Sequence, residues 1–128
     1  MNALYRGSCL CGAVTYQLGS PIKAVSHCHC SQCRKGHGAA FASYGSVPAA
    51  SLTCLDPQGL VRVFHSSPTV SRSFCACCGA NLFWANAAGA FPDWISIALG
   101  TLDTPFEAAR QRHVHVESKV CWLLDATH

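Results

Sequence analysis

The sequence predicts a mostly β fold, and three observations support this. Seven short stretches alternate apolar with polar residues or are rich in β-branched and aromatic residues, as half-buried strands are. Gly, Pro, Asn, Asp and Ser separate these stretches, as in the predicted turn at 56–59. Only two short stretches are candidates for helices. At 128 residues, the chain is long enough for one domain with its own core and too short for two.

The first expected strand covers residues 13–18, where Val14, Tyr16 and Leu18 alternate with polar residues. Alternation of this kind places one set of side chains on each face of a sheet. The other expected strands are residues 41–44, 60–64, 70–74, 82–84, 94–99 and 113–117.

The two candidate helices cover residues 31–36 and 104–110. The second begins with Thr104 as a possible N-cap, Pro105 at the first helical position and Glu107 shortly after, which are the usual start signals. With no repeat, linker or low-complexity tract, we expect a single domain over residues 1–128.

Composition excludes several classes of protein. Half of the residues are hydrophobic and 12% are charged, which is typical of a folded chain. The net charge is +3 and the nine basic residues are scattered, so we do not expect nucleic acid as the partner.

The first fourteen residues lack the pattern of a signal peptide, and no apolar stretch is long enough to span a membrane. We therefore expect a cytoplasmic protein with no membrane partner. In a reducing cytosol, ten cysteines need an explanation other than disulfides, and metal binding is the natural one.

Two cysteine pairs share the ending Cys-Gly. Cys9 and Cys11 precede Gly12, and Cys75 and Cys78 precede Gly79. A glycine there allows a backbone turn with positive φ that frees amide groups for the sulfurs. These four cysteines are expected to form one closed structural zinc site. The alternatives are buried thiols that act as small hydrophobic residues, or a redox Cys-x-x-Cys, which usually begins a helix rather than lying in a hairpin.

The middle cluster, Cys28, Cys30 and Cys33, supplies three thiolates on a predicted strand-to-helix turn. A structural zinc normally has four protein ligands, whereas a catalytic zinc keeps one position open. An open, catalytic second zinc site is therefore expected here, next to Arg34 and Lys35 as anchors for an anionic ligand. The alternative is a closed site whose fourth ligand is a histidine or Cys54.

The remaining histidines and cysteines have weaker signals. Strand alternation points His27 and His29 away from the cysteines between them, and His37 follows the cluster closely. His113 and His115 are expected to share one face of the last strand. Cys77 is expected to point away from its cluster, and Cys54 and Cys121 are interpreted as core residues.

The order of these motifs resembles that of a known family. The segments that match are Gly7-Ser8-Cys9-Leu10-Cys11-Gly12-Ala13-Val14, Cys28-His29-Cys30-Ser31-Gln32-Cys33-Arg34-Lys35, Arg72-Ser73-Phe74-Cys75-Ala76-Cys77-Cys78-Gly79 and His113-Val114-His115-Val116-Glu117-Ser118-Lys119 followed by Trp122. They look like the glutathione-dependent formaldehyde-activating enzyme (GFA) family, whose domain centromere protein V shares. Two departures are Cys121, where the family usually has proline, and Cys77.

The resemblance implies a β-tent of antiparallel sheets with zinc knuckles. It also implies a structural zinc on the first and third clusters and a second zinc on the middle cluster. The family's named activity joins glutathione to formaldehyde to give S-hydroxymethylglutathione, and its members are described as carbon–sulfur lyases.

Three functions remain open at the level of sequence. The first is a zinc enzyme of this lyase type that acts on adducts of glutathione or another small thiol with aldehydes, in a cleft lined by Phe41, Trp84 and Trp94. The second is a non-catalytic module that binds zinc or glutathione. The third, a zinc-ribbon-like domain for nucleic acid, lacks the expected basic and aromatic stripe. The oligomeric state is not indicated.

Overall fold

The computed structural model of the protein describes residues 3–123, so residues 1–2 and 124–128 of the expected domain lie outside the described part. Within residues 3–123 the chain forms ten strands, one α-helix and three short 3-10 helices. In chain order these are β1 (Tyr5–Ser8), β2 (Thr15–Leu18), β3 (Lys23–Cys28), α1 (Ser31–His37), β4 (Ala42–Pro48), η1 (Ala49–Ser51), β5 (Leu52–Leu55), β6 (Val61–His65), β7 (Val70–Cys75), β8 (Asn81–Asn86), β9 (Trp94–Ala98), η2 (Leu99–Thr101), β10 (Gln111–Val114) and η3 (Val116–Ser118).

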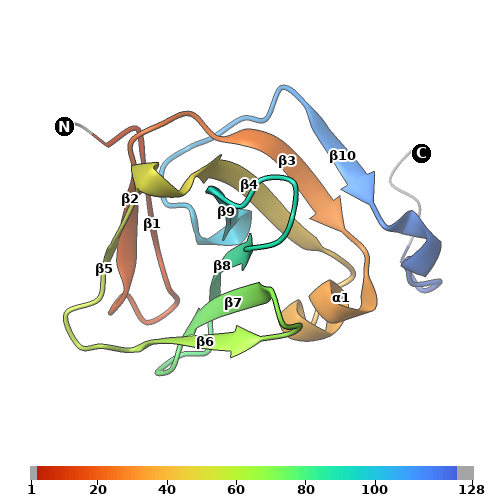
Figure 1. Cartoon of the computed structure of the whole chain (residues 1–128), viewed down its shortest axis with the longest axis horizontal. Coiled ribbons are helices and arrows are strands. Elements are labelled where there is room, and N and C mark those ends of the chain that lie inside the picture. Colours follow the sequence, from red (N-terminus) through yellow and green to blue (C-terminus); the bar gives the residue numbers. More distant parts are fainter. Residues whose placement is uncertain (1–2, 124–128) are drawn as a thin grey trace.

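The strands form two sheets, which confirms the mostly β fold (Figure 1). The smaller sheet has the order β1-β2-β5, and the larger has the order β10-β3-β4-β9-β8-β7-β6. Neighbouring strands are antiparallel, except that β10 pairs with β3 in parallel. In Figure 1 the smaller sheet stands at the left and α1 lies at the lower right.

The main core lies between the two sheets. Tyr16 on β2 is fully buried, and its ring meets that of Phe83 on β8 edge to face, with the ring centroids 5.4 Å apart. Its hydroxyl lies 2.6 Å from the Thr101 hydroxyl, so its polar end is satisfied. Gly7, opposite Tyr16 on β1, is in direct contact with this ring, so a side chain at residue 7 would collide with it.

The prediction of a helix over residues 104–110 is wrong. This segment runs beside β1, where the backbone N–H groups of Asp103 and Thr104 donate to the Arg6 carbonyl. The Arg6 N–H in turn donates to Thr104 Oγ1 at 2.9 Å, and Phe106 packs against Tyr5. A helix of seven residues has little stability of its own, so these contacts decide the conformation.

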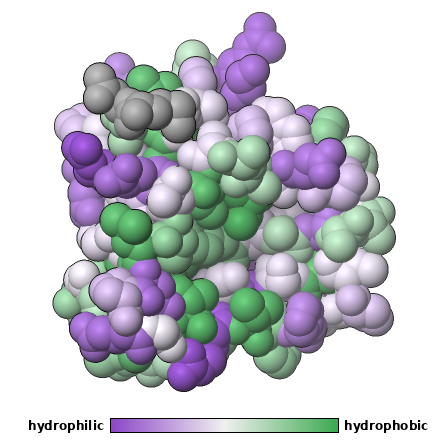
Figure 2. Space-filling model, turned by 60° about the vertical axis from the view of Figure 1, so that its left-hand side comes forward, coloured by the Kyte–Doolittle hydropathy of each residue, from purple (hydrophilic) through white to green (hydrophobic). Residues whose placement is uncertain are grey.

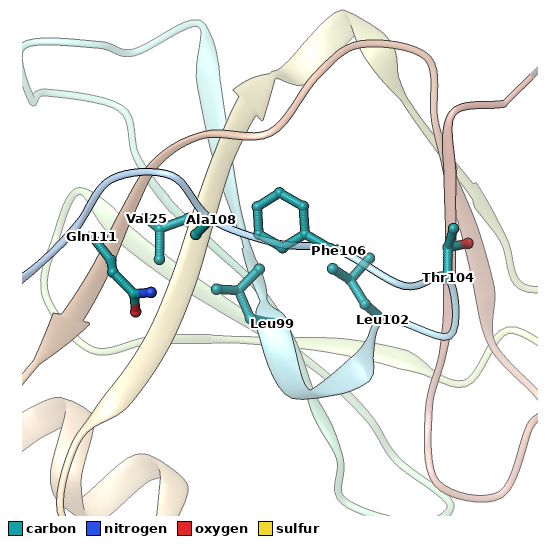
Figure 3. A pocket seen from close by; sticks show the side chains of 7 residues that line it. All are labelled: Val25, Leu99, Leu102, Thr104, Phe106, Ala108 and Gln111. Atoms are coloured by element: carbon teal, nitrogen blue, oxygen red, sulfur yellow. The ribbon is translucent and has the colours of Figure 1, made fainter.

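Phe106 also helps to line a surface hollow of about 380 Å³ beside this segment (Figure 3). Leu99 and Leu102 lie around the same hollow, on the chain that leaves β9. The apolar side chains of residues 99–108 therefore pack along this stretch and do not form one face of a helix.

The last strand covers Gln111–Val114 and so lies earlier in the chain than the predicted 113–117. It ends at Val114, which pairs with Cys28, the final residue of β3. His115 adopts a left-handed conformation with φ of 56° and leads into η3, so it does not share a strand face with His113. The strands β1 and β5 were not expected from the sequence, and β3 was expected only as the strand that leads into the helix at residue 31.

Hydrophobic and hydrophilic residues intermingle on the surface, with hydrophobic residues gathered toward the middle of the face in Figure 2. Folded proteins normally expose a share of their apolar side chains. None of the helices within the described residues has the length and hydrophobicity needed to cross a membrane.

Candidate functional site

The first and third cysteine clusters lie on two turns with similar backbone geometry. Gly12 and Gly79 have φ of 81° and 78°, which confirms the positive φ expected after each second cysteine. The Gly12 N–H donates to the Cys9 carbonyl, and the Gly79 N–H donates to the Cys75 carbonyl at 2.7 Å. Each turn thereby folds its two sulfurs toward the same side.

The two turns meet in space. The sulfur atoms of Cys9, Cys11, Cys75 and Cys78 all lie within 4.8 Å of one another, and Cys11 Sγ is 3.9 Å from Cys75 Sγ. One pair follows β1 and the other lies between β7 and β8. The cluster therefore connects the small sheet to the large one.

The pKa values of two thiols in this four-cysteine cluster are those expected of a cation-binding site. The backbone N–H groups of Ala80 and Cys11 lower the pKa of Cys78 to about 6. For Cys11 the backbone amide of Ala13 acts in the same direction, but the Cys9 sulfur, burial and the other two sulfurs of the cluster together outweigh it and raise the pKa to about 12. Four thiolates this close repel one another, and a bound cation removes the repulsion. Four thiolates at this spacing suit a tetrahedral ion such as zinc.

The middle cluster is built by the junction of β3 and α1. Cys28 ends β3, Cys30 is the N-cap of α1, and Cys33 lies in the first turn of the helix, as the strand-to-helix prediction requires. The Cys33 N–H donates to Cys30 Sγ at 3.4 Å. The three sulfurs lie within 4.8 Å of one another, and no fourth His, Cys, Asp or Glu of residues 3–123 joins this group.

These three residues also fit a metal ion, because three thiolates on a tight turn form one face of a tetrahedron. Burial raises the pKa of Cys28 to about 12, so without a cation this thiol stays protonated. The cluster lies beside a cavity of about 240 Å³, which all three cysteines help to line. These three cysteines would hold such an ion beside that cavity.

Sequence reasoning missed the charged group in this cavity. The Nη1 and Nη2 atoms of Arg72, on β7, each donate to Cys33 Sγ at 3.7 Å. Nη1 also donates to the Tyr44 hydroxyl oxygen at 3.4 Å, and that oxygen lies 2.9 Å from His37 Nε2. Burial and the charge of Arg72 both lower the pKa of His37. The only signal in the sequence was the position of Arg72 three residues before Cys75, within the motif already noted.

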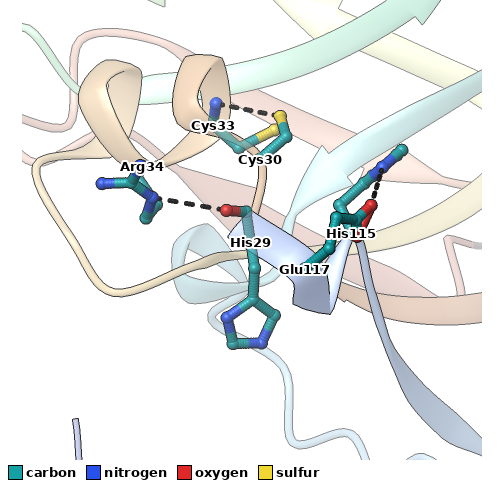
Figure 4. Close-up of polar contacts among 6 residues, drawn as sticks. All are labelled: His29, Cys30, Cys33, Arg34, His115 and Glu117. Carbon is teal, nitrogen blue, oxygen red and sulfur yellow. Dashed lines mark hydrogen bonds and ion pairs between the residues drawn. The ribbon is translucent and has the colours of Figure 1, made fainter. Parts of the chain in front are cut away.

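The predicted anchors lie outside the cavity lining. Arg34 Nε donates to the carbonyl oxygen of His29 at 3.3 Å (Figure 4), and Lys35 is exposed. His115, by contrast, lines the cavity, and its Nδ1 lies 3.7 Å from Glu117 Oε1. A role of Arg34 and Lys35 in ligand binding stays a prediction.

The histidines of β3 point away from the cysteines, as expected. His27 and His29 pack with Phe41 and His113 on the other side of the strand, and His29 Nε2 lies 2.7 Å from His113 Nδ1. Of the three aromatic residues expected in the cleft, Trp84 lines the cavity; Phe41 belongs to this histidine group, and Trp94 lines a different hollow.

The leftover cysteines take no part in either cluster. Cys77 is exposed and outside the group formed by its neighbours, as predicted. The interpretation of Cys54 and Cys121 as core residues is wrong, because both are exposed. Cys54 lies on β5 of the small sheet, so it does not complete the middle cluster.

Residues 4–118 match the family model described as glutathione-dependent formaldehyde-activating enzyme. The chain belongs to this family. The match spans both cysteine clusters and Arg72, so the residues that form the site lie within the family domain.

The chain is similar to an uncharacterized lyase of Schizosaccharomyces pombe, with 29% identity over 92 residues that cover 72% of this chain. It spans about 65% of the length of that relative. It also resembles the crystal structure of a Rhodobacter sphaeroides protein, with a TM-score of 0.63 and 20% identity over 85% of this chain and 99% of the other. This second likeness concerns the fold alone.

Proposed function

We propose that the protein is a zinc-dependent carbon–sulfur lyase-like enzyme that acts on adducts of glutathione or another small thiol with aldehydes, of the S-hydroxymethylglutathione type. The observation that carries the proposal is the three-thiolate group of Cys28, Cys30 and Cys33 at a cavity that also holds an arginine. Family membership and the lyase name of the yeast relative support it. The unit that acts is the single domain of this chain, in the cytoplasm.

Two zinc sites with different tasks follow from the ligand counts. Cys9, Cys11, Cys75 and Cys78 would hold a structural ion, since four thiolates complete a tetrahedron. Cys28, Cys30 and Cys33 would hold a second ion with one position left for a ligand. When bound there, zinc supplies positive charge that stabilises a thiolate at neutral pH.

The proposed reaction forms or breaks one carbon–sulfur bond. In the direction of addition, the thiolate sulfur bonds to the carbonyl carbon, the carbonyl π pair moves to oxygen, and water supplies the proton that completes the hydroxyl group. The cavity of about 240 Å³ is smaller than the usual range for drug-sized ligands, so the reacting end of the thiol would enter it and the remainder would lie outside. Arg34 and Lys35, which lie on α1 and outside the cavity lining, are the proposed anchors for the carboxylates of glutathione.

The test is the rate at which formaldehyde, glutathione and their adduct interconvert, measured by NMR magnetisation exchange with zinc-loaded protein. The proposal expects exchange faster than the uncatalysed background, and loss of that acceleration in Cys30→Ala. Lys23→Ala is the matched control, because Lys23 is exposed at the far end of β3 and outside this cavity. Saturable glutathione binding without faster exchange would instead support a non-catalytic zinc- or glutathione-binding module.

A further inference from the structure

The guanidinium group of Arg72 is held in place from several sides. Its Nε donates to Ser66 Oγ at 2.9 Å, and its two terminal nitrogens contact Cys33 and Tyr44. Gly36 of α1 lies beside it, at a distance where an added Cβ would make an ordinary contact with Nη1 at 3.9 Å. A planar group fixed in this way presents its remaining donor in a defined direction.

One donor of this group is left over. Arginine has five N–H groups, and four of them have acceptors here, two on the Cys33 sulfur and one each on Tyr44 and Ser66. The remaining N–H, on Nη2, has no acceptor among residues 3–123, and Arg72 lines the cavity. The geometry therefore leaves a charged donor available to a ligand in the cavity.

The charge of Arg72 also has no carboxylate partner. Within residues 3–123 the one ion pair joins His115 and Glu117, and no Asp or Glu lines the cavity. Arginine is mostly exposed in proteins and is almost never fully buried unless it is paired, and Arg72 is half-buried. With a divalent ion bound, three thiolates would carry one negative charge more than the ion balances, so the Cys33 sulfur would then be one anionic partner of Arg72 and a ligand with negative charge another.

We propose that Arg72 is a catalytic residue whose free N–H binds the oxygen of the thiol–aldehyde adduct, while its other donors fix the Cys33 sulfur. This inference rests on the proposed function and adds a specificity for adducts that carry a hydroxyl group on the carbon next to sulfur. As the carbon–sulfur bond forms, the carbonyl π pair becomes the lone pair of an alkoxide, and Arg72 is the donor placed to stabilise it until water protonates it. In reverse, the hydroxyl proton leaves to water, the carbonyl re-forms and the thiolate departs.

The experiment compares Arg72→Gln and Arg72→Lys with the matched control Arg62→Gln. Arg62 lies on the adjacent strand β6, is exposed and donates only to nearby backbone carbonyls. Four quantities are measured for each: catalysed adduct exchange, affinity for S-methylglutathione, zinc per chain, and folding by circular dichroism. S-Methylglutathione keeps the tripeptide and the thioether carbon but lacks the adduct oxygen.

We expect Arg72→Gln to slow catalysed exchange by roughly 100-fold, as removal of one charge-stabilising donor does in other enzymes. Its affinity for S-methylglutathione and its zinc content should stay within about twofold of the wild type. Arg72→Lys keeps the positive charge but lacks the planar guanidinium group with its several N–H donors, so its exchange rate should lie between those of Arg72→Gln and the wild type. Arg62→Gln should match the wild type.

Three results would overturn this role of Arg72. Exchange within about threefold of the wild-type rate in Arg72→Gln would show that the adduct oxygen does not need it. A large loss of S-methylglutathione affinity would make Arg72 a carboxylate anchor, and a loss of zinc would make it only a support for the Cys33 sulfur. If the wild type does not accelerate exchange at all, the proposed function itself fails, and this role falls with it.

Discussion

Replacing Cys78 by alanine is expected to remove most of the stability of the domain. The four-cysteine cluster joins residues far apart in the sequence, since Cys11 and Cys75, whose sulfurs lie 3.9 Å apart, are separated by 64 positions. Cross-linking a loop of that length removes chain entropy worth about 4 kcal/mol in the unfolded state. Metal binding to structural sites contributes on the order of 10 kcal/mol, and whole domains are stable by only about 5–15 kcal/mol. Loss of one ligand therefore costs at least ~4 kcal/mol.

The assay is urea unfolding followed by tryptophan fluorescence and circular dichroism, with zinc and with a chelator. Cys78→Ala in zinc should behave like the wild type in chelator. Cys77→Ala is the control, because Cys77 is the adjacent residue, is exposed and lies outside the cluster. If the free energy of unfolding of Cys78→Ala stays within about 1 kcal/mol of the zinc-loaded wild type, the cluster does not act as a structural cross-link.

Three further predictions concern the second site, acidity and the core. Cys30→Ala should lower zinc per chain by one and lower the free energy of unfolding by only about 1 kcal/mol, since it removes the N-cap of α1 but not the link between the sheets. If this variant unfolds like the Cys78 variant in thermal melts, the open-site hypothesis is wrong. Because the pKa of Cys78 is lowered to about 6, the stability from its thiolate is fully present above the ordinary thiol value and is lost as pH falls through about 6. Urea unfolding of the zinc-free protein should accordingly show lower stability at about pH 5 than at about pH 8, and equal stability at both pH values would contradict this. Gly7→Ala should destabilise by about 2 kcal/mol or more, because the added methyl group collides with Tyr16; an unchanged unfolding midpoint in urea would show that the ring can move aside.

Much of the candidate site could be predicted because the metal clusters depend on local spacing. A glycine after each cysteine pair requires the positive φ that Gly12 and Gly79 adopt, and Cys30 followed by a short helix requires a strand-to-helix turn. The same local logic placed His27 and His29 on the opposite side of β3 from the cysteines. It failed for residues 104–110, where good local start signals for a helix were outweighed by hydrogen bonds to Arg6 and by packing of Phe106.

By itself, the sequence determined that the chain is mostly β. It also determined that two groups of cysteines suit zinc and which cysteines form each group, because ligand type and backbone turns are properties of short segments. Only the tertiary structure decided which residues share the cavity with the three-cysteine group. Arg72 and Tyr44 lie on strands β7 and β4, which two intervening strands separate in the sheet, and they meet Cys33 because α1 packs near both. Contacts between distant segments depend on the order of the strands in the sheet, and no local pattern in the sequence encodes that order.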